Sequence, residues 1–487
     1  MPFDINVIWD IYKNAPNYQA AIKRFEDGSL SDLVSYYNST YSQYVKSDVL
    51  EDMAESIYCY GFSEHEPTQD ETQVHSYLTE LMYFGLMEEG QWIIGPRDFE
   101  VLLGVIIPLS FAASKYSPDY FYPYLFALRF PDFISVLNVL DINLPEIPKR
   151  TEYERRFEYY WTFCQILGEI RNRFHLTHTE TCVFIYDFLP SIIEGEKATL
   201  PEATQCWFIG GRICKEDVHG DKSIWQVNKD TRPGDILVHY ETSPISAVTT
   251  IWRAQSNGCT DPFFRFNTYA VIGNRVNVPH ISLSELKQDG YFSTFPLTKK
   301  NFQGVNGFRM DSGAYQELLR MLSVKGADIS LLPKLYAPEI VPNPGIVIEH
   351  DVEEMLIIPL LESLGLEINR DYKRQMGIHI GSGHRVFPDI VVYYNEMQET
   401  AEIIIEAKLQ MRNRAEIERA FMQARSYALY MKSRLIILCD EHKLLIYEKS
   451  GSDFGKEDYK IIGWAEVGSP DVFNQLKTTI LNNKSYV

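Results

Sequence analysis

The stretch FPDIVVYYNEMQETAEIIIEAK, residues 387–408, decides the fold expected for the C-terminal part of this chain. It contains two apolar runs, 387–394 and 403–407, that are rich in β-branched and aromatic residues, and the polar segment 395–400 separates them. β-Branched and aromatic residues favour strands, and polar residues favour the turn between them. The stretch therefore predicts two adjacent strands that pair as a hairpin.

Three charged side chains occur in this hairpin where a buried strand should be apolar. Asp389 opens the first strand, and Glu406 and Lys408 close the second. Because side chains alternate along a strand, Glu406 and Lys408 should point to one side, and hairpin pairing places Asp389 across from them. Burying such groups is costly unless they are paired or hold a metal ion, and two carboxylates suit a hard cation such as Mg²⁺. A salt bridge at the end of a hairpin is the alternative interpretation.

The arrangement of Pro-Asp at 388–389, a spacer, and Glu-Ala-Lys at 406–408 resembles the PD-(D/E)XK nuclease superfamily. The local sequence is similar to the nuclease module of type I restriction subunits and to Mrr-like enzymes. This resemblance implies an α/β restriction-endonuclease-like domain. It also implies that Asp389 and Glu406 hold Mg²⁺ or Mn²⁺ and that Lys408 assists the attacking water.

Upstream of the hairpin, residues 350–366 have the apolar spacing of a helix. Glu353 would share one face of that helix with four apolar residues: Ile357, Leu360, Leu361 and Leu364. Superfamily members often carry a helix glutamate in the metal site, so the resemblance implies that role for Glu353, with Glu354 and Glu349 as alternatives. The other interpretation is a solvated first-turn acid that favours the helix dipole.

Downstream of the hairpin, residues 412–432 predict a long helix, and residues 434–440 and 444–449 predict strands. Gln423 and Tyr427 lie one turn apart on this helix. They resemble the Gln-x-x-x-Tyr element of the type I-like branch, which implies that Gln423 supports the active site or touches DNA. These elements complete the α-β-β-β-α-β order of the superfamily core.

A basic segment, 368–386, lies between the first helix and the hairpin. Phosphate contacts are its natural functional interpretation, and an ordinary solvated loop is the alternative. No histidine pair here has the HExxH spacing of a zinc site. The basic residues are Arg370, Lys373, Arg374, His379, His384 and Arg385.

Residues 201–310 read as short strands and turns, which predicts a β-barrel-like domain. Its aromatic and turn residues stand in an order similar to that of EVE domains of the PUA-like superfamily, although a full match to the usual N-terminal strand is absent. That resemblance implies a reader domain with a pocket for one flipped, modified base. The residues that carry it are Trp207, Trp225, Pro233-Gly234-Asp235, Tyr240, Trp252, Asp261-Pro262 and Phe263.

Four residues are candidates for that pocket. Trp225, Trp252 and Tyr240 could stack on a base, and Asp235 lies in the Gly-Asp turn. Flipping a base costs a few kcal/mol, which stacking and hydrogen bonds to the base edge must offset. The alternative is that these aromatic residues form the core of the barrel.

The remaining segments carry no motif that assigns chemistry. Residues 1–200 predict a helical domain, with helices at 117–140 and 151–174. Residues 75–95 fit either a winged-helix element or a simple helix, turn and strand. Residues 311–345 predict a helix and a Pro-rich linker, and residues 346–487 the nuclease domain, so the expected fold is multidomain α+β.

Composition limits the partners and the compartment. The net charge of -20 argues against a nucleic-acid binder, but residues 1–203 hold 31 acidic and 14 basic residues, so most of the acidity lies away from the proposed site. Seven scattered cysteines without a close CxxC pair indicate reduced thiols in a cytoplasm. No apolar stretch is long enough to span a bilayer, and the acidic N-terminus is unlike a signal peptide.

The leading hypothesis is a Mg²⁺-dependent endonuclease of a restriction system that cuts double-stranded DNA after its reader domain binds a modified base such as a modified cytosine. A double-strand cut needs two active sites, so we expect a homodimer. Three alternatives remain open: a restriction enzyme for unmodified sequence, a non-catalytic regulator that binds modified DNA, and a nuclease that requires a partner.

Overall fold

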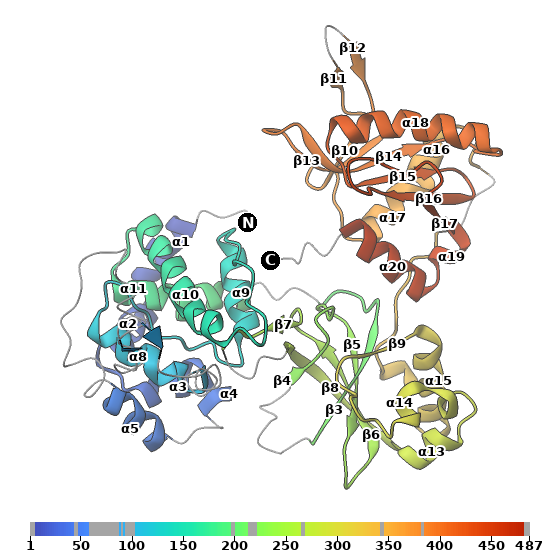
Figure 1. Cartoon of the computed structure of the whole chain (residues 1–487). Helices are drawn as coiled ribbons and strands as arrows, with labels where there is room; N and C mark the ends of the chain where they lie inside the picture. The colour runs from blue at the N-terminus through green and yellow to red at the C-terminus, as the bar shows by residue number, and fades with distance from the viewer. Residues whose placement is uncertain are drawn as a thin grey trace.

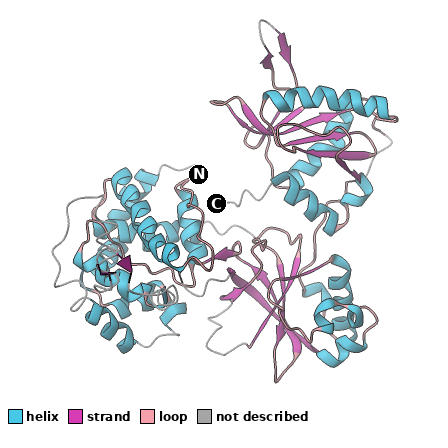
Figure 2. Ribbon diagram, viewed as in Figure 1, coloured by secondary structure: helices cyan, strands magenta, loops and turns pink. Residues whose placement is uncertain are grey.

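The computed structural model describes residues 5–42, 47–57, 87–88, 91–92, 103–195, 200–212, 222–263, 268–340, 345–380 and 384–481. These residues mix helix and sheet, with a half-barrel sheet and a second sheet. Figure 1 shows three groups of elements along the chain: helices in blue, cyan and blue-green, the half-barrel in green with its helices in yellow, and the second sheet in orange and red. Figure 2 shows that the strands gather mainly in the latter two groups.

The N-terminal group of helices packs around one aromatic-rich core. On the long helix α10, Phe157, Tyr160, Cys164 and Leu167 are buried, and Trp161 is half-buried. None of the described helices is both long and apolar enough to cross a bilayer. The elements of this group are α1 (Ile5–Lys13), α2 (Pro16–Asp27), α3 (Leu30–Tyr37), α4 (Ser39–Ser42), α5 (Ser47–Ile57), α8 (Ile106–Tyr116), α9 (Phe130–Val139), α10 (Tyr153–Phe174), α11 (His178–Val183), the π-helical η2 (Phe184–Phe188) and α12 (Leu189–Gly195).

The helix predicted at 117–140 is wrong over its first half, because only α9 is helical and residues 121–126 are buried without helix or strand. Pro123 cannot donate a backbone hydrogen bond and its ring obstructs a helix. Side chains satisfy the backbone here instead: Tyr186 Oη accepts from the Leu125 N–H at 3.1 Å and donates to the Pro123 carbonyl at 2.5 Å. The Asn38 amide donates to the carbonyls of Leu125 and Ala127. Buried polar side chains thus replace the missing secondary structure.

Most of the possible winged-helix element, 75–95, lies outside the described residues. The described part is a short antiparallel pair, β1 (Met87–Glu88) with β2 (Gln91–Trp92).

The half-barrel is a seven-stranded sheet in the order β4-β8-β6-β5-β3-β9, with β7 paired to β8. One face packs against helices through residues such as Val238, Leu286 and Leu318, and the other gathers the indole rings of Trp207 and Trp252. The elements are β3 (Cys206–Gly211), β4 (Lys222–Gln226), β5 (Ile236–Glu241), β6 (Ala247–Ala254), β7 (Cys259–Thr260), β8 (Thr268–Ser282), α13 (Leu283–Gln288), η4 (Phe292–Thr294), α14 (Pro296–Lys299), β9 (Phe308–Met310), α15 (Ser312–Val324) and η5 (Ile329–Leu331).

The second sheet has the order β10-β13-β14-β15-β16-β17. Only β14 and β15 run parallel among these neighbours, as a crossover through the helix α18 requires. One face packs against α17 and α20, and the other against α18. The elements are α16 (Glu349–Val352), the π-helical η6 (Glu353–Ile357), α17 (Ile358–Ser363), β10 (Tyr372–Arg374), β11 (Ile378–Ile380), β12 (His384–Val386), β13 (Ile390–Asn395), β14 (Thr400–Ala407), α18 (Arg414–Tyr430), β15 (Leu435–Cys439), β16 (Lys443–Glu448), β17 (Tyr459–Gly463), α19 (Trp464–Val467) and α20 (Pro470–Leu481).

Helix α20 joins the second sheet to the half-barrel through buried hydrogen bonds. Thr204 Oγ1 donates to Asn474 Oδ1 at 3.1 Å, and Asn474 Nδ2 donates to Gln205 Oε1 at 3.4 Å. The backbone N–H and the hydroxyl of Ser312 both donate to Asp471 Oδ2. Because Asn474 and Gln205 are buried, separating the two parts would leave polar groups unpaired.

Asp235 organises the turn before β5. Its Oδ2 accepts hydrogen bonds from Gln205 Nε2 at 2.8 Å, from Trp207 Nε1 at 2.9 Å and from the Arg232 N–H at 2.9 Å. Burial raises the pKa of this carboxyl to about 7, although the three hydrogen bonds oppose the rise. Asp235 therefore acts inside the fold of the half-barrel.

We predict that Asp235→Asn becomes more stable relative to wild type as the pH rises. The raised pKa means that the stabilising contribution of Asp235 is fully present below about pH 4 and is lost toward about pH 7. The difference in free energy of unfolding between variant and wild type should grow by about 3 kcal/mol across this window. Urea unfolding at several pH values measures it, with the exposed Asp230→Asn as the control. A difference that is constant with pH would contradict the assignment.

Candidate active site

Strand pairing brings Asp389 to Glu406. Ile390 at the start of β13 pairs with Ile405 of β14, so the residue before Ile390 lies beside the residue after Ile405. The Asp389 carboxylate accepts a hydrogen bond from the Ala407 N–H at 2.7 Å. This bond fixes the aspartate at the end of the hairpin, next to the second carboxylate.

Glu406 is a buried carboxyl group with an incomplete set of partners. Its side chain is fully buried, and Lys408 Nζ donates to Oε2 at 3.4 Å. The other oxygen, Oε1, is buried without a hydrogen-bond partner. Burial and the repulsion of Asp389 raise the pKa of Glu406 to about 8, and the Lys408 ammonium only partly offsets them. The arrangement therefore lacks positive charge at this point.

Lys408 lies at the mouth of this group, with 22% of its side chain exposed. Its ammonium is 3.4 Å from Glu406 Oε2 and 3.7 Å from Glu349 Oε2. Burial lowers the pKa of Lys408, but the charges of Glu406, Glu349 and Asp389 outweigh this effect and raise it overall. The lysine is therefore a charged donor beside two carboxylates.

Glu353 reaches the same region from the helix that precedes the sheet. It begins the π-helical turn η6 and is 3% exposed. Its Oε2 accepts from Arg374 at 3.0 Å. Burial raises the pKa of Glu353, Asp389 raises it further, and Arg374 opposes the rise. Because Arg374 pairs with Ile390, the residue after Asp389, this ion pair places Glu353 near the hairpin end.

Gln423 is not brought into this group. It lies exposed on α18, and the hydrogen bond recorded for its side chain goes to Tyr427 Oη at 3.3 Å. Gln423 and Tyr427 therefore lie one turn apart as predicted, but they contact each other within α18. The structure adds Glu349 instead, which the sequence offered only as an alternative to Glu353.

The residues present fit a hard divalent cation in part. Asp389 and Glu406 supply two neighbouring carboxylates, and Glu406 Oε1 is buried without a hydrogen-bond partner. No group of three His, Cys, Asp or Glu side chains is arranged to hold a metal ion in the described ranges. Mg²⁺ often takes only one or two carboxylates and completes its octahedron with waters and a substrate phosphate. Two carboxylates and an orphaned oxygen are compatible with that mode.

The basic segment before the hairpin is largely neutralised by acidic neighbours. Arg370 pairs with Glu367 and Asp371, and Lys373 pairs with Glu396. Two strands of this segment, β11 and β12, form a hairpin that projects past α18 in Figure 1. The projecting hairpin, which carries His379, His384 and Arg385 in its sequence, leads directly into the Asp389 turn.

The four base-pocket candidates separate onto different parts of the half-barrel. Tyr240 packs on the helix-covered face, where its ring stacks on Phe302 at 4.0 Å between centroids. Asp235 is enclosed by hydrogen bonds. Trp252 and Trp225 lie on the opposite face; Trp252 is 2% exposed and Trp225 is half-buried at the edge strand β4. Only Trp225 combines this face with access to solvent.

His239 is a residue on this face that sequence analysis missed. It is 1% exposed, its ring meets Trp225 edge-on at 5.0 Å, and both ring nitrogens are buried without hydrogen-bond partners. Burial and Arg275 lower the pKa of His239 to about 4, so the ring is neutral at pH 7. The alternation of β5 was the available signal, because it places residues 237 and 239 opposite 238 and 240.

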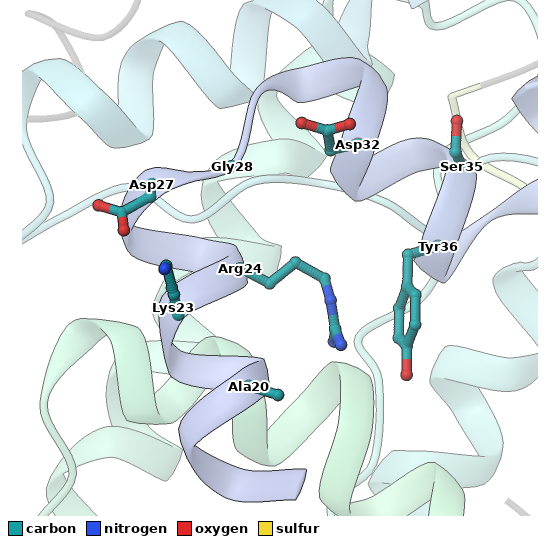
Figure 3. Close-up of a pocket in the computed structure, with 8 residues that line it drawn as sticks. All are labelled: Ala20, Lys23, Arg24, Asp27, Gly28, Asp32, Ser35 and Tyr36. Carbon is teal, nitrogen blue, oxygen red and sulfur yellow. The ribbon is translucent and has the colours of Figure 1, made fainter.

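A surface pocket of about 550 Å³ lies elsewhere, between α2 and α3 (Figure 3). Its lining mixes acidic and basic side chains, and Arg24 is already engaged by two tyrosines. The Arg24 guanidinium lies 3.5 Å from the Tyr36 ring centroid and donates to Tyr37 Oη at 2.8 Å. The two carboxylates of this pocket, Asp27 and Asp32, are exposed, unlike the buried Glu406.

Comparisons with protein-family models, with curated proteins and with solved structures find no match to this chain. Functional inference therefore depends on the geometry of the side chains.

We predict that Glu406→Gln raises the melting temperature in the presence of EDTA. The amide keeps the shape of the side chain and cannot ionise, so at a pH above about 8, where wild-type Glu406 is charged, it removes a buried charge that Asp389 repels. Mn²⁺ should stabilise the wild type by binding its folded state, and should stabilise Glu406→Gln much less. Thermal unfolding with EDTA and with Mn²⁺ measures both effects. A less stable variant in EDTA, or an equal response to Mn²⁺, would show that Glu406 is not a strained metal ligand.

Proposed function

We propose that this chain is a metal-dependent DNA endonuclease, and that cleavage is directed by a modified base bound to the half-barrel. The observation that carries the nuclease proposal is the meeting of Asp389, Glu406 and Lys408 at one end of a hairpin, with Glu406 Oε1 buried and unpartnered. Such a costly arrangement of charges is more easily understood as a site than as part of the core.

Each residue has a distinct task in this proposal. Asp389 and Glu406 would hold Mg²⁺ or Mn²⁺, and Glu353, which experiences the charge of Asp389, would complete the ligand set. A bound cation supplies Lewis acidity toward the phosphate and a more acidic water. Lys408 orients the attacking water and stabilises negative charge on the phosphate oxygens, because its ammonium is held beside the carboxylates with part of its surface open. The Glu349 carboxylate lies 3.7 Å from the same ammonium.

DNA would approach this site beside the projecting β11–β12 hairpin. The hairpin precedes Asp389 directly in the chain, and a two-stranded ribbon has dimensions that a major groove admits. The strongly acidic part of the chain, residues 1–203, belongs mainly to the helical group. A homodimer would supply the second active site that a double-strand cut requires.

The reader proposal concerns the half-barrel face with Trp225. Trp225 is the stacking candidate, because Trp252 is enclosed and Tyr240 packs on the other face. His239 lies against Trp225 with one donor and one acceptor unused, since a neutral imidazole carries one of each. Both features support a pocket for a flat polar ring, which a flipped base provides.

We predict that Asp389→Ala or Lys408→Ala reduces cleavage of DNA by at least about a thousandfold, because each removes a group required in the transition state. Binding of the same DNA should change by less than about threefold, since the phosphate backbone supplies most of the affinity. Gel cleavage assays with Mg²⁺ and with EDTA, together with filter binding, measure the two effects. Met422→Ala is the control, because Met422 is an exposed side chain of α18 that has no task in this proposal. Undiminished cutting by both purified variants rules out this active site.

We predict that the wild type cuts DNA containing modified cytosine and spares the same DNA prepared without it. Trp225→Ala should lose about tenfold or more in affinity for the modified DNA, because base–aromatic stacking is worth about 1–3 kcal/mol. Tyr291→Ala is a matched control, since Tyr291 is an exposed aromatic residue on the helix-bearing side. Equal cleavage of both DNA preparations would instead favour an enzyme that reads unmodified sequence.

A further inference from the structure

We propose that Arg374 is a positioning residue that aims Glu353 at the metal site; this inference rests on the proposed function. Glu353 is a buried carboxylate at the start of a π-helical turn, and it experiences the repulsion of Asp389. Its side chain has one ion pair among the described residues, with Arg374 at 3.0 Å. Without that cation, Glu353 would have a like charge nearby and no ion pair among the described residues.

The sheet fixes Arg374 beside the site. Arg374 ends β10 and pairs with Ile390, the residue that follows Asp389. The next residue, Gln375, donates its N–H to the Asp389 carbonyl at 2.9 Å. Tyr372, two positions earlier, packs in the core between the sheet and α17, so alternation points Arg374 toward the same helix side. The guanidinium therefore reaches Glu353 from β10, the strand that also pairs with the backbone next to Asp389.

The guanidinium has a forked arrangement that a lysine cannot reproduce. One terminal nitrogen donates to Glu353 Oε2 at 3.0 Å, and the other donates to Glu354 Oε1 at 2.5 Å. The first nitrogen also lies 3.4 Å from His350 Nδ1. Glu354 is 44% exposed, and Glu353 only 5% by side chain. The ion pair with the exposed Glu354 holds the guanidinium in place, and the ion pair with the buried Glu353 fixes the rotamer of Glu353.

Phosphate contacts are one of the two interpretations that the sequence leaves open for the basic segment, but the ion pairs of Arg374 are with the carboxylates of Glu353 and Glu354. Supporting groups of this kind tune a metal site by orienting its ligands, and their removal typically weakens metal affinity by 10- to 100-fold, an order-of-magnitude figure. We therefore assign Arg374 a role through Glu353 and not through DNA.

The test measures Mn²⁺ affinity of the purified full chain by titration calorimetry, without DNA. Arg374→Gln should weaken Mn²⁺ binding about tenfold, and Arg374→Lys should restore part of the loss because it keeps the charge. Lys373→Gln is the matched control: it removes the same charge one position away, where Lys373 pairs with the exposed Glu396. Lys373→Gln should bind Mn²⁺ within about twofold of wild type, since exposed pairs contribute little.

A double-mutant cycle decides whether Arg374 acts through Glu353. Glu353→Gln alone should weaken Mn²⁺ binding, and adding Arg374→Gln should weaken it no further. If Arg374→Gln does not fold by circular dichroism, the cycle is run with Arg374→Lys. Equal losses with and without Glu353 would overturn the positioning role.

The failure of this proposal is distinguishable from the failure of the proposed function. Wild-type affinity in Arg374→Gln, with lost affinity in Asp389→Asn, would overturn the role of Arg374 alone. Unchanged Mn²⁺ binding in Asp389→Asn would overturn both. A merely structural role for Arg374 would lower the melting temperature and leave the Mn²⁺ affinity unchanged.

Discussion

The burial of Glu406 beside Asp389 is the constraint on which the C-terminal part of the chain depends. Two carboxyl groups at the end of neighbouring strands repel each other, and burial intensifies the repulsion because little water screens it. The surrounding elements supply cations and hydrogen-bond donors. Lys408 follows β14, the Ala407 N–H donates to Asp389, and Arg374 pairs with Glu353. One oxygen is still unpartnered, and this deficit is what a divalent cation would satisfy.

The sequence predicted most of the elements that depend on interactions between neighbouring residues. The β-branched runs around Asp389 and Glu406 form β13 and β14, and antiparallel pairing is enough to bring these acids together. The buried phase of the helix with Glu353 also followed from its spacing. The extended segment around Pro123 could not be predicted from its own sequence, because side chains that are distant in the sequence hold it in place. Likewise, Tyr240 and His239 are adjacent in sequence, and only the strand alternation shows that they face opposite sides of the half-barrel.

The two faces of the half-barrel have different chemistry. The face with Tyr240 is closed by helices, whereas the face with Trp225 keeps unused hydrogen-bonding groups on His239. Asp235 and Gln205 continue by hydrogen bonds to Asn474 on α20. The turn that supports the indole of Trp207 is thereby connected to the sheet that carries the acids, through side chains that have little freedom because they are buried.

The extended segment held by Asn38 and Tyr186 also has a kinetic consequence. The hydrogen bonds that satisfy Leu125 come from residues 87 and 61 positions away along the chain. Helical proteins usually fold fast because their contacts are local, and contacts between distant positions slow the search. The helical part should therefore fold at a rate nearer to that of sheet proteins. During synthesis its first helices must wait for the ribosome to release Tyr186 before their core can close.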